Sequence, residues 1–223
     1  MAEPGAPRPA RSACHGGDYC FTSAAFPTTP RSLVQGGVGY SRSSVKRLPA
    51  RLCERPRILF VGINPSLRSA EVGHHFAGPG NPFWRLLHAA QLVPEPLTYE
   101  DDVRLPQWGL ALTNIVPRAT REASELSRAE FEAGRVALAR LIARVEPEVV
   151  AFVGTTVYRA FFGSDASGGA GPKPERIGDA RVFVLPNPSG RNAVYPGFED
   201  KLVWFRRLRQ FVDRKPAAPS SGR

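Results

Sequence analysis

The feature that most constrains this chain is a regular alternation of short apolar runs with helical patterns. Four runs of five to seven residues are rich in β-branched and aromatic residues, which favour strands: Arg57–Val61, Leu110–Val116, Val149–Val153 and Arg181–Leu185. Strands separated by helices are typical of parallel pairing, with helices on both faces of the sheet. The pattern therefore predicts an α/β fold, a three-layer α/β/α sandwich around a mostly parallel sheet of about four or five strands.

The segments between these runs carry helix signals. Ser127 and Glu130 form a capping box, which opens a long helix that ends near Pro147. Further helices are predicted at Phe83–Gln91, Thr155–Phe162 and Phe198–Val212, whereas Gly163–Arg176 is predicted to be a glycine-rich loop. In such a sheet, functional groups gather on loops beyond the carboxyl ends of the strands. The loops after the first and fourth strands are therefore the candidate sites.

The two ends of the chain differ in composition from its centre. Residues 1–55 and 213–223 lack sustained periodicity, so we predict disordered basic ends around one domain at 56–212. Basic residues outnumber acidic ones by 9 to 3 in residues 1–57 and by 6 to 1 in 206–223, against 15 to 16 in between. Cationic ends favour a nucleic-acid partner, because Lys and Arg release counterions from phosphates. The alternative is that these ends are merely disordered and soluble.

Cysteine usage and hydropathy limit the class of protein further. Cys14, Cys20 and Cys53 are too scattered for a disulfide framework, and Cys14-His15 with Cys20 lacks a fourth metal ligand nearby. We therefore expect no metal and a reducing compartment. No apolar run approaches the roughly 18 to 20 residues of a membrane span, and the N-terminus lacks the apolar centre of a signal peptide. We expect a soluble intracellular protein, cytoplasmic and nucleoid-associated in a bacterium or nuclear in a eukaryote.

The loop after the first strand, Gly62-Ile63-Asn64-Pro65-Ser66, places an asparagine where the chain leaves the sheet. Pro65 holds Asn64 in an extended conformation and so fixes its amide in space. An asparagine can hold a water molecule but cannot remove a proton at neutral pH, so hydrolysis built on it needs a good leaving group. The competing interpretation is an ordinary Asn-Pro turn in which Asn64 caps the next element.

The same loop continues through Gly73-His74-His75-Phe76 to Asn81. It combines flexible backbone, an aromatic ring and hydrogen-bonding side chains, which are the components of a pocket for a flipped base. Adjacent histidines could also indicate a metal site, but no Cys or carboxylate partner lies near them in the sequence.

The loop after the fourth strand contains Asn187-Pro188-Ser189-Gly190-Arg191. Its small residues allow close approach to a nucleic-acid backbone, and Ser189 with main-chain amides could bind phosphate. Arg191 could enter a duplex and fill the space left by an extruded base. Taken alone, the segment is equally an ordinary Pro/Gly loop with an exposed arginine.

Together these segments resemble the mismatch-specific uracil DNA glycosylases, a family that includes the bacterial mismatch uracil glycosylase and the vertebrate thymine DNA glycosylase. The resemblance spans about residues 57 to 212. It is carried by Gly62-Ile63-Asn64-Pro65, Gly73-His74-His75-Phe76, Gly78-Pro79-Gly80-Asn81 before Phe83-Trp84, Thr113-Asn114, Leu126-Ser127 and the Pro186–Pro196 loop.

The resemblance implies a monofunctional glycosylase without metal or organic cofactor, which extrudes its target base from double-stranded DNA. It implies that Asn64 positions the attacking water, that Phe76 stacks on the base and that Asn81 lies in the pocket. The remaining implied positions are pocket residues Gly62, Ile63 (through its amide), Ser69 and His75, a phosphate-binding stretch around Ser189, and Arg191 as the wedge. We expect a monomer whose abasic product passes to downstream repair enzymes.

Two positions depart from the family pattern. Ser66 replaces the usual glycine after Asn-Pro, which could stiffen the loop or add a donor near the substrate. Ser69 stands where the vertebrate enzyme has alanine, in the stretch facing the 5-position of the base. A hydroxyl there is a poor match for the methyl group of thymine, so we expect uracil to be processed much better than thymine.

Three other functions stay open at this point. The chain could be a broader uracil glycosylase that also attacks single strands, and ethenocytosine could be a further substrate. It could also be a DNA-binding protein that has kept the fold and lost hydrolysis, with Ser66 as a mark of drift. A small-molecule α/β enzyme would show no affinity for DNA at low salt.

Overall fold

The computed structural model describes residues 47–163, 166, 168–189 and 192–214. A five-stranded sheet in the order β2-β1-β3-β5-β4 forms its centre. The strands are β1 (Ile58–Gly62), β2 (Leu110–Asn114), β3 (Val149–Val153), β4 (Gly171–Ile177) and β5 (Ala180–Leu185). All neighbouring pairs are parallel except β4 with β5, which is antiparallel. The predicted α/β class and mostly parallel sheet are confirmed.

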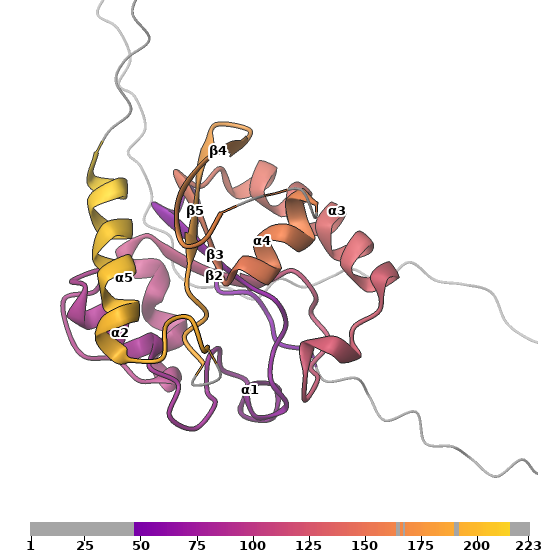
Figure 1. Ribbon diagram of the computed structural model, residues 1–223, viewed down its shortest axis with the longest axis horizontal. Helices are drawn as coiled ribbons and strands as arrows, with labels where there is room; N and C mark the ends of the chain where they lie inside the picture. The colour runs from indigo at the N-terminus through magenta and orange to yellow at the C-terminus, as the bar shows by residue number, and fades with distance from the viewer. Residues whose placement is uncertain (1–46, 164–165, 167, 190–191, 215–223) are drawn as a thin grey trace, which may run out of the picture. The chain divides into compact units, whose positions relative to one another are not determined.

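Helices cover both faces of this sheet, as predicted. In Figure 1, α2 (Phe83–Ala89) and α5 (Phe198–Asp213) lie on one side, whereas α3 (Arg128–Val145) and α4 (Thr155–Phe162) lie on the other. The described residues contain three further helical elements: α1 (Leu67–Val72) and the 3-10 helices η1 (Tyr99–Trp108) and η2 (Ala123–Glu125). Among the described residues, no helix is both long and apolar enough to cross a membrane.

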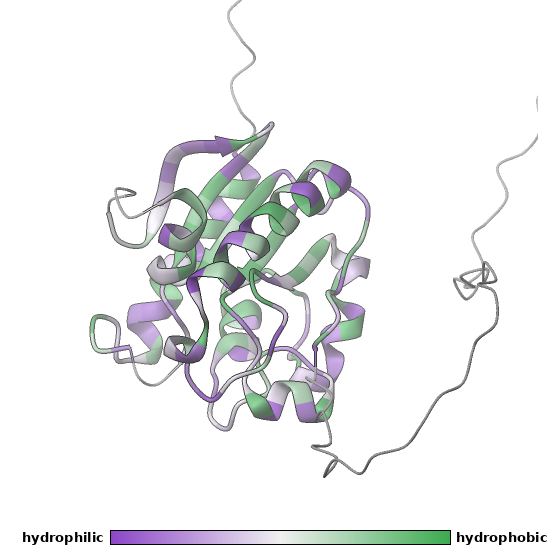
Figure 2. Ribbon diagram, turned by 90° about the vertical axis from the view of Figure 1, so that its right-hand side faces the viewer, coloured by the Kyte–Doolittle hydropathy of each residue, from purple (hydrophilic) through white to green (hydrophobic). Residues whose placement is uncertain are grey.

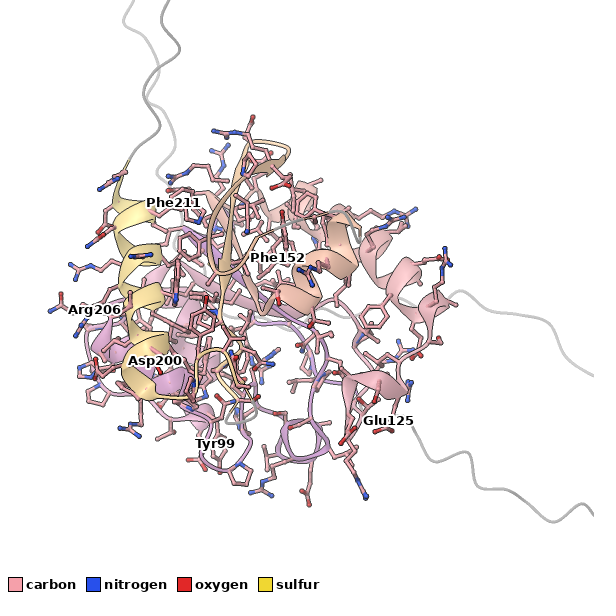
Figure 3. The ribbon with its side chains drawn as sticks, in the orientation of Figure 1. Tyr99, Glu125, Phe152, Asp200, Arg206 and Phe211 are labelled. Carbon is pink, nitrogen blue, oxygen red and sulfur yellow. The ribbon has the colours of Figure 1, made fainter. Side chains whose placement is uncertain are left out.

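The strands are apolar along their length because both of their faces are buried. In β1, Ile58 and Phe60 point into the core shared with α2 and α5, and the alternate residues Leu59 and Val61 point into the core shared with α3 and α4. In Figure 2 the strands of the central sheet are coloured mainly as hydrophobic, whereas the helices around them carry both hydrophobic and hydrophilic residues. In Figure 3, Phe152 and Phe211 mark the two cores on opposite sides of the sheet.

One predicted loop is a strand in the structure. The second half of the glycine-rich segment Gly163–Arg176 forms β4, which pairs with β5 from Gly171 onward. Pro172 and Pro174 concealed this strand, because proline removes donors from a ladder. Because β4 lies at the edge of the sheet, it pairs only with β5, and its outer side needs no hydrogen-bond donors for a second strand.

The packed domain begins before residue 56. The amide and carbonyl of Arg51 bond to the carbonyl and amide of Leu112 at 2.9 and 2.8 Å, which covers the outer edge of β2. Leu48 is buried, and Arg47 makes an antiparallel bridge to Arg118. We call residues 47–52 the strap. Residues 1–46 of the predicted leader, with Cys14 and Cys20, and the tail from residue 215 lie outside the described residues.

Candidate active site

A cavity of about 1180 Å³ opens where the loops after the parallel strands converge. Figure 1 shows α1 and the loop after β5 at the same end of the sheet. Most of the predicted site residues line this cavity: Gly62, Ile63, Asn64, Ser69, His75, Phe76, Asn81, Asn187 and Ser189. Pro188 is buried and is not among the lining residues. The predicted wedge, Gly190 and Arg191, lies outside the described residues.

The amide of Asn64 is held in one orientation by the loop that follows β2. Its Nδ2 donates to the carbonyl oxygens of Arg118 (3.0 Å) and Pro65 (3.2 Å) and to the hydroxyl oxygen of Thr120 (2.6 Å). The Thr120 hydroxyl donates its own proton to the carbonyl of Glu122 at 2.7 Å, so it must accept from Asn64. These acceptors identify the bonded atom as the nitrogen. Within the described part of the chain the carbonyl oxygen of Asn64 has no donor, so it can accept a hydrogen bond from a ligand or water.

The loop that holds Asn64 is itself anchored to α3. Arg118 pairs with Glu130 at 2.5 Å and donates to the carbonyl of Glu125 at 2.9 Å. Glu130 also completes the predicted capping box with Ser127, which is confirmed. The bonds from Arg118 and Ser127 lower the pKa of Glu130 to about 2, so this carboxylate stays charged at neutral pH. The start of α3 therefore fixes the acceptors that orient Asn64.

Ser66, the departure from the family pattern, caps α1. Its hydroxyl accepts from the amide of Ser69 at 3.1 Å and bonds to the Ser69 hydroxyl at 3.1 Å. The Ser69 hydroxyl in turn accepts from the amide of Ala77 at 3.2 Å. The two serines thus join the start of α1 to the pocket segment, which is the stiffening role that we considered for Ser66.

Phe76 forms an aromatic wall of the cavity. Its ring stacks on Phe83 with centroids 3.9 Å apart and planes 18° apart, which covers one face of the ring. Its backbone has φ of 53°, a left-handed conformation that residues other than glycine adopt only when their surroundings impose it. Because Phe76 also lines the cavity, its other face is the surface on which a planar base can stack.

His75 and Asn81 are polar groups of the same segment. His75 is 2% exposed, and burial lowers its pKa to about 4, so its ring is neutral at physiological pH. Its Nε2 donates to the carbonyl of Pro49 at 3.0 Å. The Oδ1 of Asn81 accepts from the amide of Phe83 at 3.0 Å, which leaves the NH2 group of Asn81 as a donor for a ligand. No cluster of potential metal ligands occurs in the part of the chain that the structure describes.

The loop after β5 is braced by two asparagines. The Oδ1 of Asn187 accepts from the amide of Ser189 at 3.0 Å, and the Nδ2 of Asn192 donates to the carbonyl of Asn187 at 3.1 Å. Asn187 and Ser189 therefore face the cavity from a defined turn. Arg121 and Arg159 also line the cavity and add positive charge to it, which suits a ligand that carries phosphate groups.

Several residues of the site were assigned no role from the sequence, although Asn114 belongs to one of the motifs that carry the resemblance. Asn114 ends β2 in register with Gly62, and a side chain at Gly62 would come within 2.5 Å of the Asn114 amide oxygen. Its position at a strand end, beside Gly62 in the sheet, was the available signal. Thr120 and Leu48 had no such signal, because each reaches the cavity only through tertiary contacts.

Comparison with known proteins agrees with this geometry. A model of the uracil DNA glycosylase superfamily matches residues 49–209, so the match begins within the strap. The chain belongs to the uracil DNA glycosylase superfamily.

Two individual proteins are similar to this chain. The G/U mismatch-specific uracil DNA glycosylase of Schizosaccharomyces pombe is 33% identical over 167 residues, which make up 70% of this chain and 51% of that protein. The chain thus spans about half the length of this relative. A solution NMR structure of a candidate uracil DNA glycosylase from Methanosarcina acetivorans shares 22% identity with a TM-score of 0.49, over 74% of this chain and 98% of that one.

Proposed function

We propose that this protein is a monofunctional DNA glycosylase that removes uracil mispaired with guanine from double-stranded DNA. The observation that carries the proposal is the fixed amide of Asn64, whose carbonyl oxygen faces a cavity with an aromatic wall and accepts no hydrogen bond from the residues that the structure describes. The relative from Schizosaccharomyces pombe, named for the same mismatch, supports the choice of substrate. Ethenocytosine opposite guanine is a further candidate.

The proposed reaction needs no general base. The target nucleotide leaves the duplex and its base stacks on Phe76, with the NH2 group of Asn81 donating to a base carbonyl. The N-glycosidic bond breaks, and its electron pair leaves with uracil as an anion. Water held by the Asn64 carbonyl oxygen adds to the sugar carbon and loses a proton to solvent, which yields free base and an abasic site. Asn64 cannot remove that proton early, so the rate depends on the leaving group.

The remaining assignments concern DNA. Asn187 and Ser189 approach the phosphates, while Arg191 fills the gap in the duplex and contacts the opposite guanine. The protein acts as a monomer in this proposal and passes its abasic product to downstream repair enzymes. It works in the compartment that holds DNA, which is the nucleoid of a bacterium or the nucleus of a eukaryote.

Uracil is preferred over thymine because of Ser69. This side chain is 3% exposed and lines the cavity, where its hydroxyl group is engaged with the Ala77 amide. A thymine methyl group placed against it would gain no apolar contact and would crowd a bonded hydroxyl. Comparable single-turnover rates on G·U and G·T duplexes would contradict this assignment.

The test is excision from matched oligonucleotides that carry uracil, thymine, hypoxanthine or ethenocytosine opposite guanine or adenine. We expect uracil opposite guanine to be cleaved fastest. Equal rates opposite guanine and adenine, or on single strands, would favour a broad uracil glycosylase. DNA binding without any excision would favour an inactive member of the fold.

A further inference from the structure

The strap makes an ion pair next to the segment that precedes Phe76. The carboxylate of Asp102, in η1, is completely buried, and its Oδ1 lies 3.0 Å from the Nε of Arg51 in the strap. The Arg51 side chain is only 17% exposed. A carboxylate in such surroundings needs a charged partner, and Arg51 is that partner.

This ion pair holds both sides of the turn that precedes Phe76. The Nη2 of Arg51 donates to the carbonyl of Gly73 at 2.7 Å. Asp102 accepts from the amide of His75 at 2.9 Å and is bonded to the Nδ1 of His74 at 3.0 Å. One arginine and one carboxylate, neither of them in the cavity lining, therefore fix three consecutive residues of the pocket segment.

Two other residues of the strap, Pro49 and Leu48, also lie at the pocket. The carbonyl of Pro49 accepts from the His75 ring, and the side chain of Leu48 lines the cavity. Immediately beyond this turn lies Phe76 in its left-handed conformation. Such a conformation persists only where the surrounding structure imposes it, and the strap and Asp102 supply that constraint.

We propose that the strap, through the Arg51–Asp102 ion pair, positions the base-stacking turn and so determines which bases the pocket accepts. This inference rests on the proposed function. Arg51 and Asp102 are positioning residues, because they act through Gly73–Phe76 and not on the substrate. Loosening the turn moves the stacking ring relative to Asn64, which harms a close-fitting base such as uracil more than a larger one.

The test compares Arg51→Met and Arg51→Lys with the wild-type protein in single-turnover excision of uracil and of ethenocytosine, each opposite guanine. For Arg51→Met we expect uracil excision to fall by about tenfold to a hundredfold, as misplacement near 1 Å does in other active sites. Ethenocytosine excision should fall less, so the ratio of the two rates shifts toward the larger base. Affinity for abasic DNA should stay within about twofold, because the loop at Asn187–Ser189 is untouched.

Arg55→Met is the matched control. This substitution also removes one positive charge close to the strap. The ion pair of Arg55 with Glu146 is exposed, however, and neither residue lines the cavity. We expect this variant to keep both rates. If Arg51→Met does not fold, Arg51→Lys serves instead, because its ammonium group retains the charge but cannot reproduce the two-point contact with Asp102 and Gly73; it should show the same shift, reduced in size.

An unchanged ratio of the two rates in a folded Arg51 variant would overturn the proposal, whether both rates stay at the wild-type level or fall by the same factor. Wild-type protein that excises no base would refute the proposed function instead. The two failures are therefore distinguishable.

Discussion

Replacing Thr120 by valine tests how the protein orients its central asparagine. Valine fills the same space, and Thr120 is only 4% exposed, so the change removes hydrogen bonds without opening a cavity. The lost bonds are those from Asn64 (2.6 Å) and to the Glu122 carbonyl (2.7 Å). At about 1 kcal/mol each, they predict a loss of about 2 kcal/mol in the free energy of unfolding, or roughly 4 to 8 °C in Tm.

The effect on excision follows from what Asn64 retains. Two of its three acceptors, the carbonyls of Pro65 and Arg118, remain, so the amide keeps its orientation but is held less firmly. A loss of about 1.4 kcal/mol in transition-state stabilisation corresponds to about a tenfold lower rate. Single-turnover excision from a G·U duplex measures this rate directly, with enzyme in excess over DNA.

The matched control for this variant is Thr98→Val. Thr98 donates to Asp101 at 3.1 Å in an exposed turn before η1 and does not line the cavity. Its loss should lower Tm slightly and leave excision unchanged. Excision at the wild-type rate by Thr120→Val with the expected fall in Tm would refute the role of Thr120 in holding Asn64.

Two further predictions concern stability. In Gly134→Ala, the new Cβ would lie 2.2 Å from the carbonyl oxygen of Ile115, so α3 must shift away from the sheet. We expect urea unfolding to show a loss of more than about 2 kcal/mol in the free energy of unfolding, against about 1 kcal/mol for the exposed control Ala137→Gly. Equal stability of Gly134→Ala and the wild-type protein would contradict this prediction. For His75, burial lowers the pKa to about 4 from about 6.5 in the unfolded chain, so the unfolded state binds the extra proton between these values and stability falls as the pH drops through that window. We expect about 2 kcal/mol less stability at pH 5 than at pH 7, and a His75→Gln variant with the same pH dependence would show that another group is responsible.

The sheet was predictable from the sequence because its strands are buried on both faces and so form continuous apolar runs. Helix α3 was predictable because Ser127 and Glu130 lie at the spacing of a capping box. Strand β4 was not, since Pro172 and Pro174 oppose a strand everywhere except at an edge, and an edge is defined only by the assembled sheet. Local sequence therefore predicts two kinds of element: strands that are apolar along their whole length, and helices that begin at a local capping motif.

The site divides in the same way. Asn64 could be proposed from the sequence because it follows the first strand closely, where functional groups collect, and Phe76 because it is an aromatic residue in the same long loop and in a family motif. Asp102 was missed because it lies in the acidic run Glu100-Asp101-Asp102, which has the composition of a solvated helix start. Its partner Arg51 lies 51 residues away in a segment that we assigned to the leader. Only the folded chain brings these charges together, and sequence periodicity carries no information on such a contact.

The most direct test compares wild-type protein with Asn64→Ala in two assays: single-turnover excision from a G·U duplex, and equilibrium affinity for the abasic duplex of the same sequence. The wild-type protein should release uracil. The variant should lose excision by at least about a hundredfold and keep its affinity for abasic DNA, because the phosphate-binding loop is unaltered. An Asn64→Ala protein that excises uracil at the wild-type rate would contradict the claim that this amide positions the attacking water.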